Sequence, residues 1–266
     1  FTAPLLALAN RWYLVIPIAV VITALAGFYS TKLEATFDVK DFFKRDSDFV
    51  VGLDKIEEHA GKTGGEPAII YVQGDLANPG ALLAVDDFLE RLATDPYVAK
   101  NNYGEASLQA RPIFVLLDRV LGSKYARAQI EETTGVAIKP GQYVGTTQYA
   151  GKEYRWPSSS KQLKAIFDYI AVHGVPQGPS QNIYDRLEVG ETLFHDPTGV
   201  QEDSTVLVLG IPGTREQANV IKSRETLTQA IESLGANPSI SFVGITGSPY
   251  TRQAALDATT NGLQRA

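Results

Sequence analysis

One stretch of the sequence constrains the fold more than any other. Residues 12–31 (WYLVIPIAVVITALAGFYST) carry no charge and are bounded by Arg11 and Lys32. Twenty helical residues span about 30 Å, the thickness of a bilayer hydrocarbon core, and aromatic residues stand at both ends of the run. A signal peptide has a shorter apolar core, and a soluble core helix has a polar stripe. We therefore expect an interfacial segment and a transmembrane helix within residues 1–33.

The composition of the whole chain excludes several classes. Hydrophobic residues make up 44% and charged residues 20% of the 266 residues, which indicates a globular protein rather than a disordered one. The net charge of −6 argues against a nucleic-acid partner. The absence of cysteine excludes disulfides, thiolate metal sites and cysteine nucleophiles. Because methionine is also absent, we expect an internal piece of a longer polypeptide.

Beyond the apolar stretch, residues 34–102 have the pattern of a strand, a helix and a strand. The run PAIIYV at 67–72 is compact and β-branched, as in a buried strand. Asn78 and Pro79 supply an N-cap and a first-turn proline for a helix with one apolar stripe. Residues 97–100 are a weaker strand candidate. This region is the first predicted βαβ half.

The same order of elements recurs in residues 201–247. Residues 205–211 (TVLVLGI) form a strong strand signal, Thr214 and Gln217 have the spacing of a capping box, and residues 240–246 predict a closing strand. Two such βαβ units predict an α+β fold of the ferredoxin-like type, with both helices on one face of a four-stranded sheet.

Residues 103–200 between the two halves are too many for a loop. The run 113–121 is apolar almost all round, and apolar residues within 163–170 fall on one helical stripe, so we expect a mainly helical insert. Two interpretations stay open. The insert either packs its apolar residues as a core, or offers them to a lipid-like ligand or partner. In the second case the substrate path would include Phe114, Leu117, Leu121, Phe167 and Ile170.

Motifs for catalysis or metal binding are incomplete. His59, His173 and His195 lack metal-ligand spacing and are expected at the surface or at helix ends. The turn at 61–63 (GKT) lacks the first glycine of a phosphate-binding loop, and Ser248 is not in a nucleophile elbow. We therefore expect no catalytic residues, no metal site and no cofactor.

Two phrases carry a family resemblance. LEATFDVKDFFKRDSDFV follows the apolar stretch, and VGITGSPYTRQAALDATTNGLQRA ends the chain. Together with the layout, they resemble the RND superfamily of exporters, in the MMPL and Patched-like branch of lipid and hydrophobe transporters. In that family an aspartate-rich segment follows the first membrane helix. A closing helix, here 248–266, leads toward the next membrane helix. The matching aspartates are Asp38, Asp41, Asp46 and Asp48.

The resemblance implies a location and a role. Residues from about 36 onward would form an extracytoplasmic porter domain in the cell membrane, part of an ion-driven exporter and not an enzyme. Its partners would be the lipid bilayer, a hydrophobic or lipid-like substrate, and the remaining membrane helices and second porter domain of the same transporter. Substrate, driving ion and assembly into a homo-oligomer stay open. The alternative is a single-pass, membrane-anchored ligand-binding or sensor domain.

Overall fold

The computed structural model describes residues 12–30, 44, 47–52, 55, 64–141 and 143–265. The chain divides into two compact units, Phe1–Phe37 and Asp38–Ala266. Of the four aspartates that match the RND family, only Asp48 is among the described residues, and it is exposed. His59 and the turn at 61–63 also lie outside them. The predictions for those positions are therefore left as they stand.

The uncharged stretch forms helix α2, Trp12–Ser30. Its described large apolar side chains, between Tyr13 and Tyr29, are 51% to 64% exposed, with no covered face. Within the part of the chain that is described, no helix has the length and apolar character that crossing a membrane requires. The side chains of Trp12, Leu14, Val15 and Ser30 are outside that part. The helix is confirmed, and its membrane role stays a prediction.

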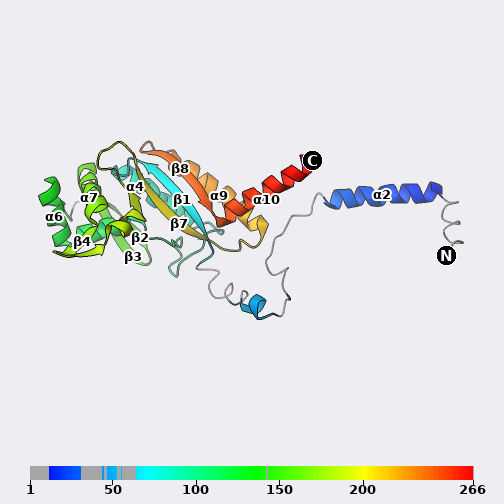
Figure 1. Cartoon of the computed structure of the whole chain (residues 1–266), viewed down its shortest axis with the longest axis horizontal. Coiled ribbons are helices and arrows are strands. Elements are labelled where there is room, and N and C mark those ends of the chain that lie inside the picture. Colours follow the sequence, from blue (N-terminus) through cyan, green and yellow to red (C-terminus); the bar gives the residue numbers. More distant parts are fainter. Residues whose placement is uncertain are drawn as a thin grey trace. The chain divides into compact units, whose positions relative to one another are not determined.

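The second unit is built on a four-stranded sheet in the order β6-β7-β1-β8, with every neighbouring pair antiparallel (Figure 1). Its strands are β1 (Glu66–Gly74), β6 (Leu193–Phe194), β7 (Asp203–Ile211) and β8 (Ile240–Gly247). Three of them confirm the strands predicted at 67–72, 205–211 and 240–246. Alternate residues of β1 are buried, as expected for a strand with one face toward the core.

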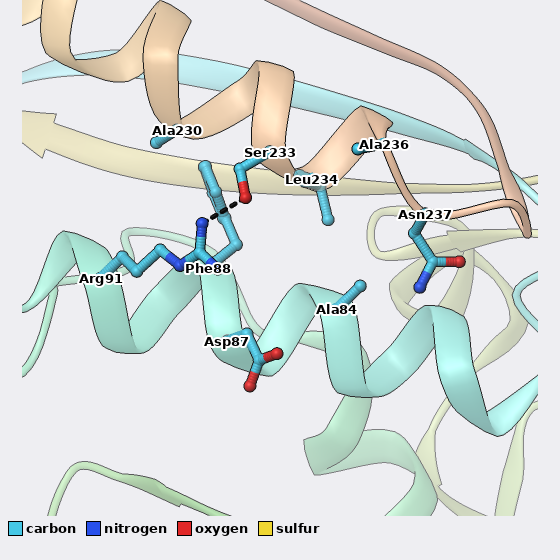
Figure 2. Close-up of a pocket in the computed structure, with 9 residues that line it drawn as sticks. All are labelled: Ala84, Asp87, Phe88, Arg91, Ala230, Ser233, Leu234, Ala236 and Asn237. Atoms are coloured by element: carbon cyan, nitrogen blue, oxygen red, sulfur yellow. Dashed lines mark hydrogen bonds between the residues drawn. The ribbon is translucent and has the colours of Figure 1, made fainter.

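Helices α4 (Pro79–Leu92) and α9 (Gln217–Gly235) pack against each other and share a core with β1. Asn78 caps α4 as predicted, since its side chain accepts a hydrogen bond of 2.9 Å from the amide of Gly80. A cavity of about 230 Å³ lies between the two helices, where small residues leave room and Arg91 donates a hydrogen bond to Ser233 (Figure 2).

The start of α9 differs from the predicted capping box. Its first residue is Gln217 and no side chain caps it. The hydroxyl of Thr214 instead donates a hydrogen bond of 2.8 Å to the carboxylate of Glu66, on β1. The hydroxyl of Thr214 therefore bonds to the charged carboxylate of Glu66 and does not cap α9.

The predicted strand at 97–100 is wrong. Side chains bond to backbone amides that a strand would use for its ladder. The carboxylate of Asp95 accepts a hydrogen bond from the amide of Tyr97 at 2.8 Å, and the side chain of Asn101 accepts one from the amide of Tyr103 at 2.9 Å. Only isolated bonds join this segment to β7, such as Ala99 N–H to Gly210 C=O at 2.8 Å. The fourth strand is β6, from the insert, so the fold is mixed α and antiparallel β and the ferredoxin-like arrangement is not confirmed.

The insert is less helical than predicted. Besides its helices it holds two antiparallel hairpins, each a two-stranded sheet. The first turns at Ala150 and Gly151, both with positive φ, as a two-residue hairpin turn requires. The helices are α5 (Ile113–Gly122), α6 (Lys124–Thr134), α7 (Ser160–His173) and α8 (Arg186–Gly190); the strands are β2 (Tyr143–Tyr149), β3 (Lys152–Pro157), β4 (Val175–Gly178) and β5 (Gln181–Tyr184).

The last helix, α10 (Ser248–Arg265), leaves the sheet beside the point where β1 begins. Ala68 of β1 pairs with Gly247 of β8, and Arg252 contacts the carboxylate of Glu66 at 3.1 Å. Partial burial alone would raise the pKa of Glu66, but hydrogen bonds from Arg252, Thr214 and Ser248 outweigh it, and the pKa lies below its usual value. The chain therefore enters β1 and leaves β8 at the same end of the sheet.

Candidate functional site

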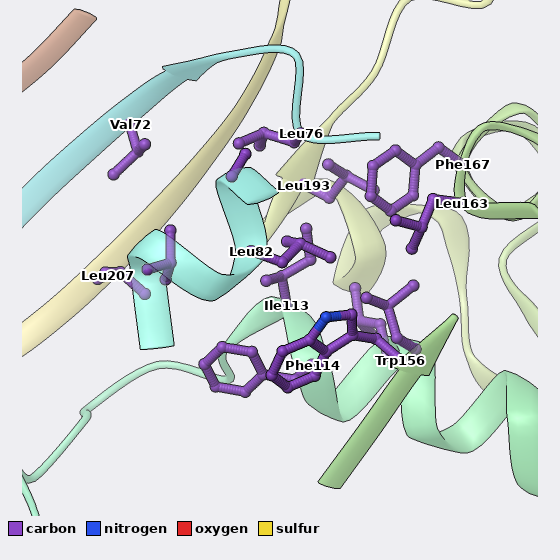
Figure 3. Close-up of a cluster of buried hydrophobic side chains, with 14 of the residues drawn as sticks. Val72, Leu76, Leu82, Ile113, Phe114, Trp156, Leu163, Phe167, Leu193 and Leu207 are labelled. Carbon is purple, nitrogen blue, oxygen red and sulfur yellow. The ribbon is translucent and has the colours of Figure 1, made fainter. Parts of the chain in front are cut away.

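The five residues predicted to line a substrate path are interior side chains. Each is 2% exposed or less: Phe114, Leu117, Leu121, Phe167 and Ile170. They belong to the same apolar cluster as side chains of the sheet and of α4 (Figure 3). The structure brings them together, and their burial favours the interpretation that they form a core. A groove lined by these residues stays a prediction.

Trp156 of β3 lies in this cluster, with its ring 5.8 Å from that of Phe114 and no exposed surface. Its indole N–H has no acceptor among the described residues.

A polar cluster surrounds His195. This residue follows β6 directly, and its side chain is 4% exposed. Its Nδ1 atom lies 2.6 Å from a carboxylate oxygen of Asp203, and its Nε2 atom lies 2.8 Å from one of Asp168. Asp203 is the first residue of β7, whereas Asp168 is on α7 of the insert. His195 therefore connects the insert to the sheet, contrary to the expected surface position.

The loop from β6 to β7 is held by Asp196. Its carboxylate accepts hydrogen bonds from the amides of Thr198, Val200 and Gln201 at 2.9 to 3.2 Å, and from the hydroxyl of Thr198 at 2.7 Å. These bonds stabilise the charged form and lower the pKa of Asp196 to about 2. The loop is thereby fixed in the conformation that returns the chain to Asp203.

The geometry around His195 favours its charged form. A neutral imidazole has one N–H, so it can donate to only one of two flanking carboxylates, whereas the imidazolium can donate to both. Burial alone would lower the pKa of His195, but hydrogen bonds and charges of Asp203 and Asp168 outweigh it and raise the pKa above its usual value. Lys164 lies 3.0 Å from Asp168 and supplies a further cation.

A cavity of about 270 Å³ adjoins this cluster. It lies where α7, the turn after β1 and the loop before β7 meet. Its charged lining residues are Asp75, Lys164, His195, Asp196, Glu202 and Asp203. Glu202 is already engaged, because its carboxylate accepts hydrogen bonds from Gln73 at 3.2 Å and from Ser241 at 2.5 Å.

A larger cavity of about 720 Å³ lies beside α5, between β3 and the β4–β5 hairpin. Asp118 of α5 is at its wall and pairs with Lys152 at 3.0 Å and with Arg155 at 3.6 Å. The lining is mainly polar and charged, so this cavity suits a polar ligand better than an acyl chain.

The other sequence candidates have structural roles. His173 is the last residue of α7, with its ring 4.8 Å from that of Tyr169, as expected for a helix-end histidine. The hydroxyl of Ser248 donates to Glu66 at 2.9 Å. Across the described ranges, no group of three or more histidine and carboxylate side chains is placed to hold a metal ion.

No family model matches the chain, and no curated protein matches it.

Proposed function

We propose that this chain is the first membrane helix and the extracytoplasmic porter domain of one half of an RND-type, ion-driven exporter of lipids or other hydrophobic molecules. The domain acts by changing conformation while the ion moves elsewhere in the transporter, and it catalyses no reaction. The observation that carries the proposal is α2.

Helix α2 contains no charged residue, and its described apolar side chains are exposed on every face. Exposed apolar area costs about 25 cal/mol per Å² in water, so a helix of this kind needs an apolar environment on all sides. A lipid bilayer, with neighbouring membrane helices, supplies one. This supports the membrane-spanning assignment.

The path of the chain through the second unit supports the same layout. Glu66 begins the central strand, and Ser248 starts α10 beside it, joined to Glu66 by a hydrogen bond. A domain whose two connections leave from one end is suited to a position between two membrane helices, because neither connection has to cross the domain. That is the layout the family resemblance implies.

A second candidate is a single-pass, membrane-anchored ligand-binding or sensor domain. The observation that favours it is the 720 Å³ cavity beside α5, whose charged lining suits a polar ligand. The two proposals differ in what the gene encodes after residue 266. The exporter requires further apolar runs of about 20 residues and a second porter domain, whereas the sensor requires neither.

Cysteine labelling of intact cells tests the topology, because the chain has no native cysteine. Ser180 lies in the exposed turn between β4 and β5, so Ser180→Cys should react with a membrane-impermeant maleimide before lysis. Asn10→Cys, on the other side of α2, is the matched control and should react only after lysis. The reverse pattern would place the domain in the cytoplasm. Equal labelling of both positions before lysis would contradict the assignment of α2 as a membrane span.

A further inference from the structure

Side chains from three segments meet at His195. Asp168 belongs to α7 of the insert, Asp203 begins β7 of the sheet, and His195 directly follows β6. The ring of Phe167, next to Asp168 on α7, lies 5.8 Å from the imidazole ring. The imidazole is therefore a polar bridge between two parts of the domain.

We propose that His195 is a proton-operated clasp, which ties the polar side of α7 to the start of β7 while the imidazole is charged and loosens this link when the imidazole is neutral. The charged ring donates one hydrogen bond to each carboxylate. Once it loses a proton, one ring nitrogen presents a lone pair to a carboxylate oxygen less than 3 Å away. If the lone pair faces Asp203, this buried carboxylate loses the donor and the counter-charge that His195 supplies, which is unfavourable. If it faces Asp168, that carboxylate keeps Lys164 as its partner, but its bond to the ring is lost and α7 is no longer joined to His195.

The surrounding charges favour retention of the proton. Carboxylates come from every element around the ring: Asp75 after β1, Asp168 on α7, Asp196 and Glu202 in the loop, and Asp203 on β7. Lys164 is the lysine among the lining residues, and it pairs with Asp168. Burial works against the imidazolium, but Asp203 and Asp168, the two carboxylates in contact with the ring, outweigh it and raise the pKa of His195.

The sign of the pH effect follows from this shift. A histidine whose pKa is higher in the closed state than in the open state stabilises the closed state fully below about pH 6.5, its unshifted value. That stabilisation is lost as the pH rises through the folded-state pKa. Buried apolar side chains of α7 stay in the core, so the release affects the polar side of the helix and the 270 Å³ cavity beside it. The clasp does not depend on the exporter proposal.

Hydrogen exchange of the full chain in detergent tests the clasp between pH 6 and 9. After correction for the intrinsic exchange rate, amides of α7 should lose protection as the pH rises, by about tenfold for each unit by which the folded-state pKa exceeds 6.5. His195→Gln should give low protection that does not vary with pH. His173→Gln, at the end of the same helix, is the matched control and should keep the wild-type profile. A flat wild-type profile, or an unchanged slope in His195→Gln, would overturn the proposal.

A titration of the wild-type protein covers the case in which His195→Gln does not fold. The proton on the carbon between the ring nitrogens of His195, followed by NMR, should titrate with a midpoint above 6.5. Asp168→Asn, which keeps the shape of the side chain and removes its charge, should lower that midpoint. A midpoint at or below 6.5, or one that Asp168→Asn leaves unchanged, would reject the clasp.

Discussion

Helices α2 and α5 are both strongly apolar, but they differ in how their side chains are covered within their own units. Eight of the ten residues of α5 are buried, Asp118 among them, whereas the described large apolar side chains of α2 are more than half exposed. The side chains that cover α5 come from distant parts of the same unit, such as Leu82 and Trp156. The comparison teaches that apolar composition shows that a helix must be covered, while only the contacts show what covers it.

The largest expected effect is at Phe114 of α5. Phe114→Ala should lower the free energy of unfolding by about 3–5 kcal/mol, because it leaves a cavity in a closely packed core. Chemical denaturation of the purified protein measures this loss. Val172→Ala, at an exposed position of α7, is the control and should cost less than about 0.5 kcal/mol.

The same variant tests the predicted substrate path. If Phe114 lined a groove, Phe114→Ala would keep nearly wild-type stability and lose lipid binding or transport. A large loss of stability, with no lipid bound to the parent protein, would reject the groove and leave the packed core as the interpretation. Helix α5 would then be covered by protein alone, in contrast to the exposed α2.

A charge in α2 should have the next largest effect, and on a different quantity. Ile22→Arg should disfavour membrane insertion by about 2.5–3.5 kcal/mol, since Ile22 would lie near the middle of the bilayer. The readout is the fraction of chain in the membrane pellet, with Ile22→Leu as control. If Ile22→Arg inserted like the control, or if the parent protein were monomeric in water without detergent, α2 would not be a membrane helix.

The smallest effect is expected at the charged edge of α5. Asp118→Asn removes the carboxylate that pairs with Lys152 and Arg155, whose side chains are 48% and 42% exposed, so water replaces most of the attraction that these cations lose. We expect a loss of about 1 kcal/mol or less in the free energy of unfolding, reduced further at high salt. A loss above about 3 kcal/mol would mean that the pair acts as a buried ion pair.

Local signals in the sequence predicted much of the fold. The strands at 67–72, 205–211 and 240–246 and the helix started by Asn78 are all present, because each combines an apolar period with its own cap or turn. The β2–β3 hairpin was missed because β2 (YVGTTQY) is largely polar and its turn, Ala150-Gly151, lacks the usual asparagine or aspartate. The strand at 97–100 failed because asparagine and aspartate side chains compete for its amides.

The His195 cluster was beyond sequence reasoning for a different reason. Its partners lie 8 and 27 residues away and come from a strand and a helix with no common pattern. Each aspartate alone reads as a surface residue, and tertiary packing alone brings the carboxylates to the ring. The apolar residues Phe114 and Phe167 were identified from local pattern, but the pattern does not distinguish a core from a groove.

The position of the two chain connections gives the domain a direction of mechanical weakness. Since Ala68 pairs with Gly247, a force that separates the start of β1 from the start of α10 acts on the ladder one rung at a time, from that pair toward Gln73 and Phe242. The Arg252 to Glu66 contacts lie at the loaded end, so we expect them to break first. Under such tension we expect β8 to separate from β1 before β1 separates from β7.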